Sequence, residues 1–427
     1  MRETFHLDPK LGVPTGDSFR KLKLLLLVLS VPGALLLVSE ALGRGDLRAW
    51  QIYLVNLLFW SGFSQAGVVL SALMYMTNAR WERNLRHIFE GLTFFSPVAF
   101  VLFLVLFLGR DTIFPWIETP IPEKAVWLNI TFLFVRESFL LLVLNILNVV
   151  FLYYSFRPDA GLLLERQGPP AGYLVRKIAG GWGDYKAEKA RSESALKRLS
   201  PVIMIAYALV YSVVAFDFIM SLAPHWYSTL FGAYYFITNL YLGLAGITVW
   251  VIVLSYALKL DGYITQSHLH DLGKLVFAFC LIGLDFFWSQ YLVIWFGNIP
   301  EEISFLVVRL NDPRWLPYTV AVVSICFVLP FVLLLSHRLK TSRPWLLALA
   351  ALVFVGLWLE RYILVVPSLW HGEGTPLGWP EAAITLSFLS GFVWVYLLFM
   401  ERFPLLPFDA EQAESTPGAT SSIASAR

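Results

Sequence analysis

Long apolar runs separated by short polar segments dominate this chain of 427 residues. Each run approaches or exceeds the roughly 20 residues that an α-helix needs to cross a hydrocarbon core of about 30 Å. The ten runs lie at residues 22–42, 50–77, 90–109, 126–156, 200–221, 227–258, 272–296, 316–337, 344–367 and 381–402. The pattern predicts an all-α integral membrane fold with about ten transmembrane helices.

Composition supports this fold class and separates a membrane domain from two tails. Hydrophobic residues make up 58% of the chain and charged residues only 15%, whereas a soluble domain carries about 25% charged residues. We expect a polar N-terminal tail at 1–20, a polytopic membrane domain at 21–403 and a disordered C-terminal tail at 404–427. The net charge of only +2 argues against a nucleic-acid partner.

The distribution of basic residues predicts the orientation in the membrane. The longest polar segment, 157–199, holds nine Lys and Arg and shows no apolar periodicity, so we expect a cytoplasmic loop rather than a separate domain. Placing both termini on the same side as this loop leaves few basic residues in the opposite loops. The basic residues in the opposite loops are Arg44, Arg48, Arg110, Lys124, Arg309 and Arg314. We therefore predict that both termini are cytoplasmic.

Two short passages suggest an internal repeat. RHIFEGLTFF, from Arg86 to Phe95, is similar to LHDLGKLVFAF, from Leu269 to Phe279. Each follows a long uncharged run and opens the next helix with a histidine, an acid and a glycine. The separation of the two passages along the chain predicts two parallel four-helix bundles, unless the match is due to chance. The bundles would be formed by spans 2–5 and 6–9 and flanked by spans 1 and 10.

The stretch from His268 to Glu302 is the most informative part of the sequence. Its apolar run is interrupted near the middle by Asp285, and it ends in the acidic pair Glu301 and Glu302. A carboxylate halfway across a bilayer is costly unless it is paired or used. Asp285 is therefore either a functional group or a structural polar residue with a partner.

Several other ionisable residues fall within predicted spans. A ladder of such groups suits proton movement or a quinol site, although the adjacent acid and base pairs could also bind neighbouring helices. The candidates for a proton path are Arg136, Glu137, Asp217, Asp285, Glu360 and Arg361. Candidates for its entrance, at the predicted cytoplasmic helix ends, are Glu90, His270, Asp271 and Lys274.

Redox metal centres are not expected in this chain. All seven histidines fall in tails, loops or span ends, and Cys280 and Cys326 stand alone in separate apolar runs. Haem b in a helix bundle takes axial ligands from within the membrane, and iron–sulfur clusters need several cysteines. The predicted chemistry is therefore protonic, with no metal-binding site.

Two strings carry a family resemblance: AFDFIMSLAPHWYSTLFGAYYF, from Ala215 to Phe236, and HDLGKLVFAF…FFWSQYLVIWFGNIPEE, from His270 to Glu302. Shorter matches are ARWERNLRHIFE, LGRDTIFPW and FVRES. The chain resembles the ActF-type membrane subunit of bacterial alternative complex III, a quinol:cytochrome c or oxidase oxidoreductase. That subunit belongs to the NrfD-like, or polysulfide reductase membrane subunit, family.

The resemblance implies a respiratory role in a multisubunit complex of the bacterial plasma membrane. Haem c and iron–sulfur centres would reside on partner subunits, and a paralogous NrfD-like membrane subunit and a terminal oxidase would be further partners. Quinone, such as menaquinone, is an implied ligand, with proton translocation as the more plausible contribution of this chain. Glu301 and Glu302, in an expected outward loop, are candidates for docking those partners.

Two residues depart from the family pattern. Ala223 stands where an acid is expected before Pro224 and His225, and Asp285 occupies a position that is more often aromatic or neutral. The first departure weakens a role for the loop after residue 221. The second means that a role for Asp285 depends on the physical argument alone.

Two other classes of protein would have a similar composition. A secondary transporter also has helix bundles and buried ion pairs, but it usually breaks corresponding helices near the midplane. Here the in-span residues Pro32, Pro97 and Pro330 do not occupy corresponding positions. A passive anchor for redox subunits would have little use for four separate intramembrane carboxylates.

Overall fold

The chain is described here from a computed structural model. The described residues are 6–7, 14–15, 17–41, 43, 48–79, 81, 85–167, 173–260, 263–370 and 376–406. The C-terminal tail predicted at 404–427 lies outside these ranges from residue 407 onward, as do Arg44 and His371.

Ten helical segments of the described chain are long and apolar enough to cross a membrane, which confirms the predicted fold class. The longer helices that contribute to them are α1 Asp17–Ala41, α2 Arg48–Met76, α4 Ser96–Val105, α6 Ile130–Gln167, α8 Tyr185–Phe218, α9 Phe231–Leu258, α10 Gln266–Gly297, α15 Arg343–Leu369 and α16 Trp379–Met400. The shorter α-helices are α3 Arg86–Leu92, α5 Arg110–Ile113, α7 Tyr173–Ile178, α11 Pro300–Asn311, α12 Leu316–Val323, α13 Leu329–Leu333 and α14 His337–Thr341; of these, α3, α5, α12 and α13 fall within the ten segments. Two-residue strands β1 His6–Leu7 and β2 Pro14–Thr15 pair antiparallel.

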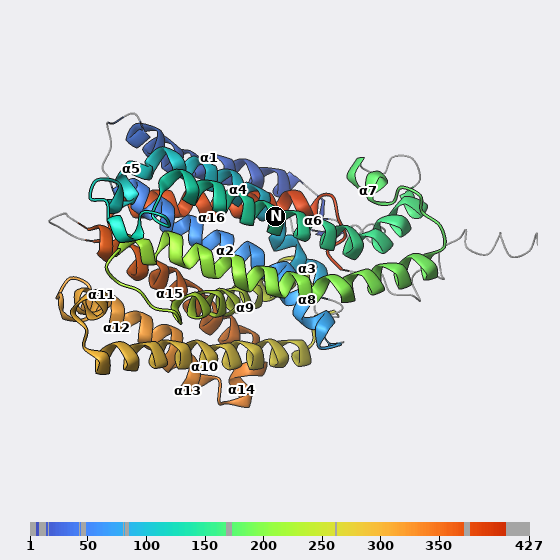
Figure 1. Cartoon of the computed structure of the whole chain (residues 1–427). Coiled ribbons are helices and arrows are strands. Elements are labelled where there is room, and N and C mark those ends of the chain that lie inside the picture. The colour runs from blue at the N-terminus through green and yellow to red at the C-terminus, as the bar shows by residue number, and fades with distance from the viewer. Residues whose placement is uncertain are drawn as a thin grey trace, which may run out of the picture.

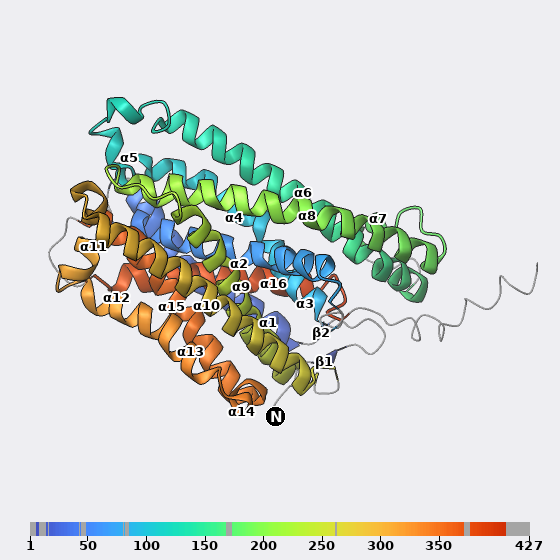
Figure 2. The ribbon, with the colours of Figure 1, turned by 60° about the horizontal axis from the view of Figure 1, so that its bottom comes forward.

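Helices α2 and α9 form the centre of the membrane domain. They pack against each other, and both contact α8 and α15, while α1 and α10 lie at the periphery (Figures 1 and 2). One end of the domain carries α5 and α11 and is called the α11 end; the other carries α3 and α7 and is called the α7 end (Figure 1). The division into two four-helix bundles stays a prediction.

Small residues allow α2 to approach its neighbours closely, as its row of Gly, Ser and Ala predicts. A Cβ atom added at Gly62 would lie 2.2 Å from Oδ1 of Asn239 on α9. One added at Gly67 would lie 2.3 Å from the carbonyl oxygen of Phe89 on α3. Any larger side chain at these two positions must therefore displace a neighbour.

Pro330 changes the local helix geometry between α12 and α13, where Ser324–Val328 form a π-helical turn. Proline has no backbone N–H, so the carbonyl of Cys326, four residues earlier, lacks its α-helical donor. The Tyr241 hydroxyl of α9 donates to this carbonyl at 2.7 Å, and the Cys280 thiol lies 3.6 Å from it. A side chain from a central helix thus replaces the missing backbone donor.

The segment 157–199 is more ordered than a polar loop. Helix α6 continues to Gln167 and α8 begins at Tyr185, so both project beyond the membrane domain at the α7 end (Figure 1). Arg157 of α6 donates to Glu188 of α8 at 2.7 Å. The prediction of a loop was wrong for most of this segment, because paired polar residues sustain a helix as well as apolar periodicity does.

Candidate functional site

An arginine and two acids from α6 and α8 form a buried cluster toward the α11 end. Arg136 donates to Oδ2 of Asp217 at 2.9 and 2.6 Å. The indole nitrogen of Trp127 donates to the other oxygen of Asp217 at 2.9 Å, and the Arg136 guanidinium lies 3.8 Å from the centre of the Trp127 ring. The carboxylate is thus held by charge and by donors on both oxygens.

Glu137 is the second acid of this cluster and is completely buried. It neighbours Asp217, and neither of its oxygens has a hydrogen-bond donor among the described residues. One guanidinium therefore balances one of two adjacent acids. A pair of this kind is suited to holding a proton that can be passed on.

A second acid–arginine cluster joins α9 and α15. Tyr234 donates to Glu360 at 2.6 Å, and Glu360 pairs with the adjacent Arg361. The other terminal nitrogen of Arg361 donates to Thr238 at 2.9 Å and to Asn239 at 3.1 Å. Both charges are buried, and each has several polar partners, as an ion pair in a low-dielectric interior requires.

Tyr235 of α9 lies between the two clusters. The Arg361 guanidinium is 4.3 Å from the centre of its ring, and the ring of Tyr211 from α8 lies 6.4 Å away in a stacked orientation. Tyr235 is also close enough to Glu137 to interact with it electrostatically. Its buried hydroxyl has no partner among the described residues. The two clusters therefore share one aromatic side chain.

A third buried acid, Glu90 on α3, lies toward the α7 end. The Ser155 hydroxyl of α6 contacts its two oxygens at 2.8 and 2.7 Å, and Arg86 lies 4.0 Å away. Ser155 and Glu137 are eighteen positions apart on α6, which is about 27 Å along the helix axis. The acids Glu90 and Glu137 thus stand at two depths separated by nearly the thickness of a hydrocarbon core.

Uncharged polar side chains occupy the space between these two depths. Gln65 of α2 and Asn148 of α6 exchange hydrogen bonds at 3.0 and 2.7 Å. Ser96 of α4 lies 3.4 Å from Asn148 and donates to Asn145 at 2.8 Å. These side chains form a polar column along the facing sides of α2 and α6.

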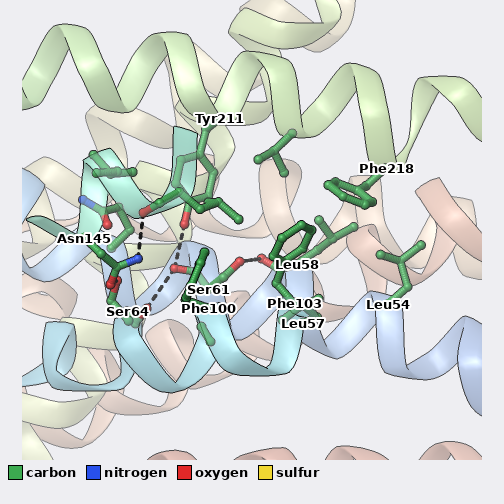
Figure 3. A pocket seen from close by; sticks show the side chains of 16 residues that line it. Leu54, Leu57, Leu58, Ser61, Ser64, Phe100, Phe103, Asn145, Tyr211 and Phe218 are labelled. Atoms are coloured by element: carbon green, nitrogen blue, oxygen red, sulfur yellow. Dashed lines mark hydrogen bonds between the residues drawn. The ribbon is translucent and has the colours of Figure 1, made fainter. Parts of the chain in front are cut away.

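A small cavity lies beside this column, between α2, α4, α6 and α8 (Figure 3). Its volume is about 40 Å³, and its polar lining includes Ser61, Ser64, Asn145 and Tyr211. The Tyr211 hydroxyl reaches from α8 and donates to the carbonyl of Ser61 at 2.9 Å. A cavity of this size with several polar partners has room for a few water molecules.

A larger cavity of about 350 Å³ lies between α10, α11 and α15 at the α11 end. Aromatic side chains form much of its wall, and Tyr234, Glu360 and Arg309 supply polar groups. Arg309 donates to the carbonyls of Ile363 and Leu364 at 2.8 Å each. Burial lowers the pKa of Arg309 to about 9, so its guanidinium stays charged at neutral pH.

The structure brings together five of the six predicted path residues and leaves out the sixth. Arg136, Glu137 and Asp217 form one cluster, and Glu360 and Arg361 form the other. Asp285, in contrast, is exposed on α10 and has no hydrogen bond or ion pair with any described residue.

The predicted entrance residues do not meet in one place. Glu90 lies at the α7 end of the polar column, whereas Asp271 and Lys274 pair with each other at 3.1 Å on the surface of α10. The ring of His270 lies 4.6 Å from that of His337 on α14. A role for any of these residues as the entrance of a proton path stays a prediction.

The acids predicted to dock partners lie on helix α11 rather than in an irregular loop. Glu301 is exposed and Glu302 is half-buried in its first turn. A hydrogen bond to the nearby Glu302 carboxylate raises the pKa of Tyr227 above its usual range. Both acids remain accessible at the α11 end.

Two polar contacts had no clear signal in the sequence. His87 was placed at a span end, but its ring is buried in α3, 3.1 Å from Asp159 and 3.0 Å from the carbonyl of Pro404. The amide pair of Gln65 and Asn148 joins residues from separate apolar runs. Among the described residues, no group of three or more His, Cys, Asp and Glu could hold a metal ion.

The fold and the buried charges define a polytopic helical membrane protein with ionisable groups inside its core. The family model for polysulphide reductase, NrfD, matches residues 42–371, and the chain belongs to this family. It is also 22% identical, over 323 residues, to a subunit of the selenate reductase of Mesobacillus selenatarsenatis. The match covers 75% of this chain and 74% of that protein. The chain is thus an NrfD-like membrane subunit of an oxidoreductase complex that takes part in electron transfer.

Proposed function

We propose that this chain is the proton-conducting membrane subunit of a quinol-oxidising respiratory complex of the alternative complex III type. The observation that carries the proposal is the polar column between Glu90 and Glu137. It combines buried acids at two depths, side chains that donate and accept hydrogen bonds, and a cavity with room for water. Intramembrane ionisable groups arranged in this way are typical of proton relays.

Each part of the column has a distinct task in this proposal. Glu90 takes up a proton at the α7 end, where Ser155 and Arg86 stabilise its carboxylate. Ser96, Asn148 and water in the small cavity move the proton along by exchanging hydrogen bonds. Glu137 receives it beside Asp217, whose charge is already balanced by Arg136.

The second cluster extends the path toward the larger cavity. Arg361 lies against Tyr235, so a change of charge on Glu137 alters the electrostatic environment of Arg361 and its partner Glu360. Glu360 in turn lines the larger cavity. Protonation in the column and events in the cavity are therefore coupled through Tyr235 in this proposal.

The larger cavity suits the ring of a quinone. NrfD-family membrane subunits typically bind a quinone, and the aromatic lining, with a volume of about 350 Å³, fits a flat apolar ring. Tyr234, Arg309 and Glu360 are the polar residues of the wall that would hold the ring, and Glu360 would hold or release a proton there. Quinone supplies the two-electron chemistry when bound, while these residues orient it.

The proposed complex places the remaining redox chemistry on other chains. Iron–sulfur and haem c subunits would dock at the α11 end, where Glu301 and Glu302 are accessible, and a paralogous membrane subunit and a terminal oxidase would complete the assembly. In this arrangement the chain spans the bacterial plasma membrane with both termini cytoplasmic. The basic residues of α7 and the projecting parts of α6 and α8 support that orientation.

The test is proton uptake per electron in the purified complex, reconstituted in vesicles and supplied with quinol. Glu137→Gln preserves size and most hydrogen bonding but cannot titrate, so we expect proton uptake per electron to fall by half or more. Asn148→Leu interrupts the column at another point and should give the same loss.

The matched control is Glu193→Gln, which removes an exposed acid from the projecting part of α8. This variant should change neither proton uptake per electron nor turnover. Haem and iron–sulfur content, measured on each variant, shows that the complex is intact. Unchanged proton stoichiometry and turnover in both Glu137→Gln and Asn148→Leu would contradict the proposal.

A further inference from the structure

Asp285 lies at lipid depth on the outer surface of the protein. It stands twelve residues before the end of α10 at Gly297, which is about 18 Å along the helix axis. Figures 1 and 2 place α10 at the periphery of the membrane domain. Its buried residues, such as Leu272, Val276 and Cys280, belong to the opposite face, which packs on the rest of the chain.

Apart from the half-buried Ser289 one turn later, the surface around Asp285 is apolar. Leu281, Ile282 and Trp288 lie within about one turn on the same side and are exposed, and Phe296 continues this face toward the α11 end. We call these four residues and Asp285 the α10 face. A single carboxyl group in the middle of such a face cannot find water in the hydrocarbon core.

The described part of this chain supplies no partner for Asp285. No described residue forms a hydrogen bond or an ion pair with it, whereas each acid of the two buried clusters has a neighbouring cation or donor. A charged carboxylate at the bilayer centre is strongly disfavoured, and even its neutral form leaves a donor and an acceptor unpaired. The free-energy cost of placing Asp285 at this depth falls if a polar or charged group from outside this chain pairs with its carboxyl group.

We propose that, in the assembled complex, a transmembrane helix from a different membrane protein of the assembly lies over the α10 face and presents a basic side chain to Asp285. Charge complementarity selects this occupant: lipid tails offer no donor, and a second copy of the chain would place one carboxylate against another. The inference depends on membership in a multisubunit complex but not on the proton path.

The first experiment identifies what touches the α10 face in native membranes. A photoreactive benzoyl-phenylalanine replaces Leu281, which is exposed and one turn before Asp285, and the irradiated complex is analysed by mass spectrometry. We expect an adduct with a different membrane-spanning polypeptide, at a segment with Lys, Arg or His within one turn. The same probe at Phe139, exposed on α6, should not give this adduct.

The second experiment measures how Asp285 contributes to assembly. Asp285→Leu leaves the partner's basic group unpaired, so we expect retention of that polypeptide through detergent purification to fall about tenfold. Asp285→Asn should lose less, because an amide still accepts a hydrogen bond. The volume-conserving change Ile282→Leu, on the same face, is the control and should leave retention unchanged.

The outcomes separate this inference from the proposed proton path. An adduct only with lipid or with a second copy of this chain overturns it, and so does full retention of the partner in Asp285→Leu. The amount and unfolding of this chain by itself should not change in Asp285→Leu, because Asp285 has no partner among the described residues. Proton stoichiometry enters neither readout.

Discussion

The hydrogen bond from Tyr241 to the carbonyl of Cys326 makes a specific contribution to stability that can be measured. Tyr241→Phe removes only the hydroxyl and keeps the ring packed against its neighbours. The carbonyl then loses the donor that replaces the missing N–H of Pro330, and only the Cys280 thiol remains, at 3.6 Å. The change therefore leaves a buried carbonyl without a strong donor.

The size of the effect follows from the environment of that carbonyl. A buried polar group without a partner costs about 1–3 kcal/mol in proteins, whereas hydrogen bonds between membrane helices contribute about 0.6 kcal/mol on average and at most about 1.7. The carbonyl has no α-helical donor that could replace the Tyr241 hydroxyl. We therefore expect Tyr241→Phe to lower the free energy of unfolding by about 1–2 kcal/mol, near the upper end of the range for membrane helices. The local π-helical turn should become more mobile as well.

The assay is the free energy of unfolding in mixed detergent micelles, with helix content as the signal. Tyr207→Phe is the matched control: the Tyr207 hydroxyl also donates to a carbonyl at 2.7 Å, that of Phe236. Phe236 lies within the regular helix α9, so its carbonyl keeps a helical donor. We expect Tyr207→Phe to cost about half as much or less. Equal losses in the two variants would refute the role assigned to Pro330.

Three further predictions concern topology, docking and packing. A cysteine at exposed Ser194 on α8 should react with an impermeant thiol reagent only in inverted vesicles. Labelling in intact cells would contradict the predicted cytoplasmic location of this segment. Replacing Glu301 and Glu302 with Lys should weaken retention of haem c and iron–sulfur subunits in moderate salt, and full retention would make these acids marginal to docking. Gly62→Ala should cost about 1–3 kcal/mol of unfolding free energy because its Cβ meets Asn239. The control Gly391→Ala, with nothing within 4 Å, should be close to neutral, and equal effects would contradict the packing argument.

The sequence was sufficient to predict the ten membrane-crossing helices because each is a long apolar run with few charges. It was less informative about where helices end. Nothing in the hydropathy of α6 and α8 shows that they continue past the bilayer, since the pairing of Arg157 with Glu188 depends on how the two helices are aligned. Helix boundaries in polar segments are set by such contacts.

The candidate site could be predicted only where a charge marks it. Glu137, Asp217 and Glu360 stand out because carboxylates are rare in apolar spans. Gln65 and Asn148 do not, because a lone amide is common in a membrane helix and its partner is defined only once two helices pack. Asp285 shows the same limit in another way: its depth follows from the sequence, but the direction it faces follows from packing.

The projecting parts of α6 and α8 have a practical consequence for imaging the complex. From Arg157 to Gln167 helix α6 extends by eleven residues, about 16 Å, and α8 runs alongside it from Tyr185. A helical hairpin of this length rises from a detergent belt as a landmark that is visible at modest resolution. Its position in a density map would mark this protein and its sidedness at once, before any side chain could be assigned.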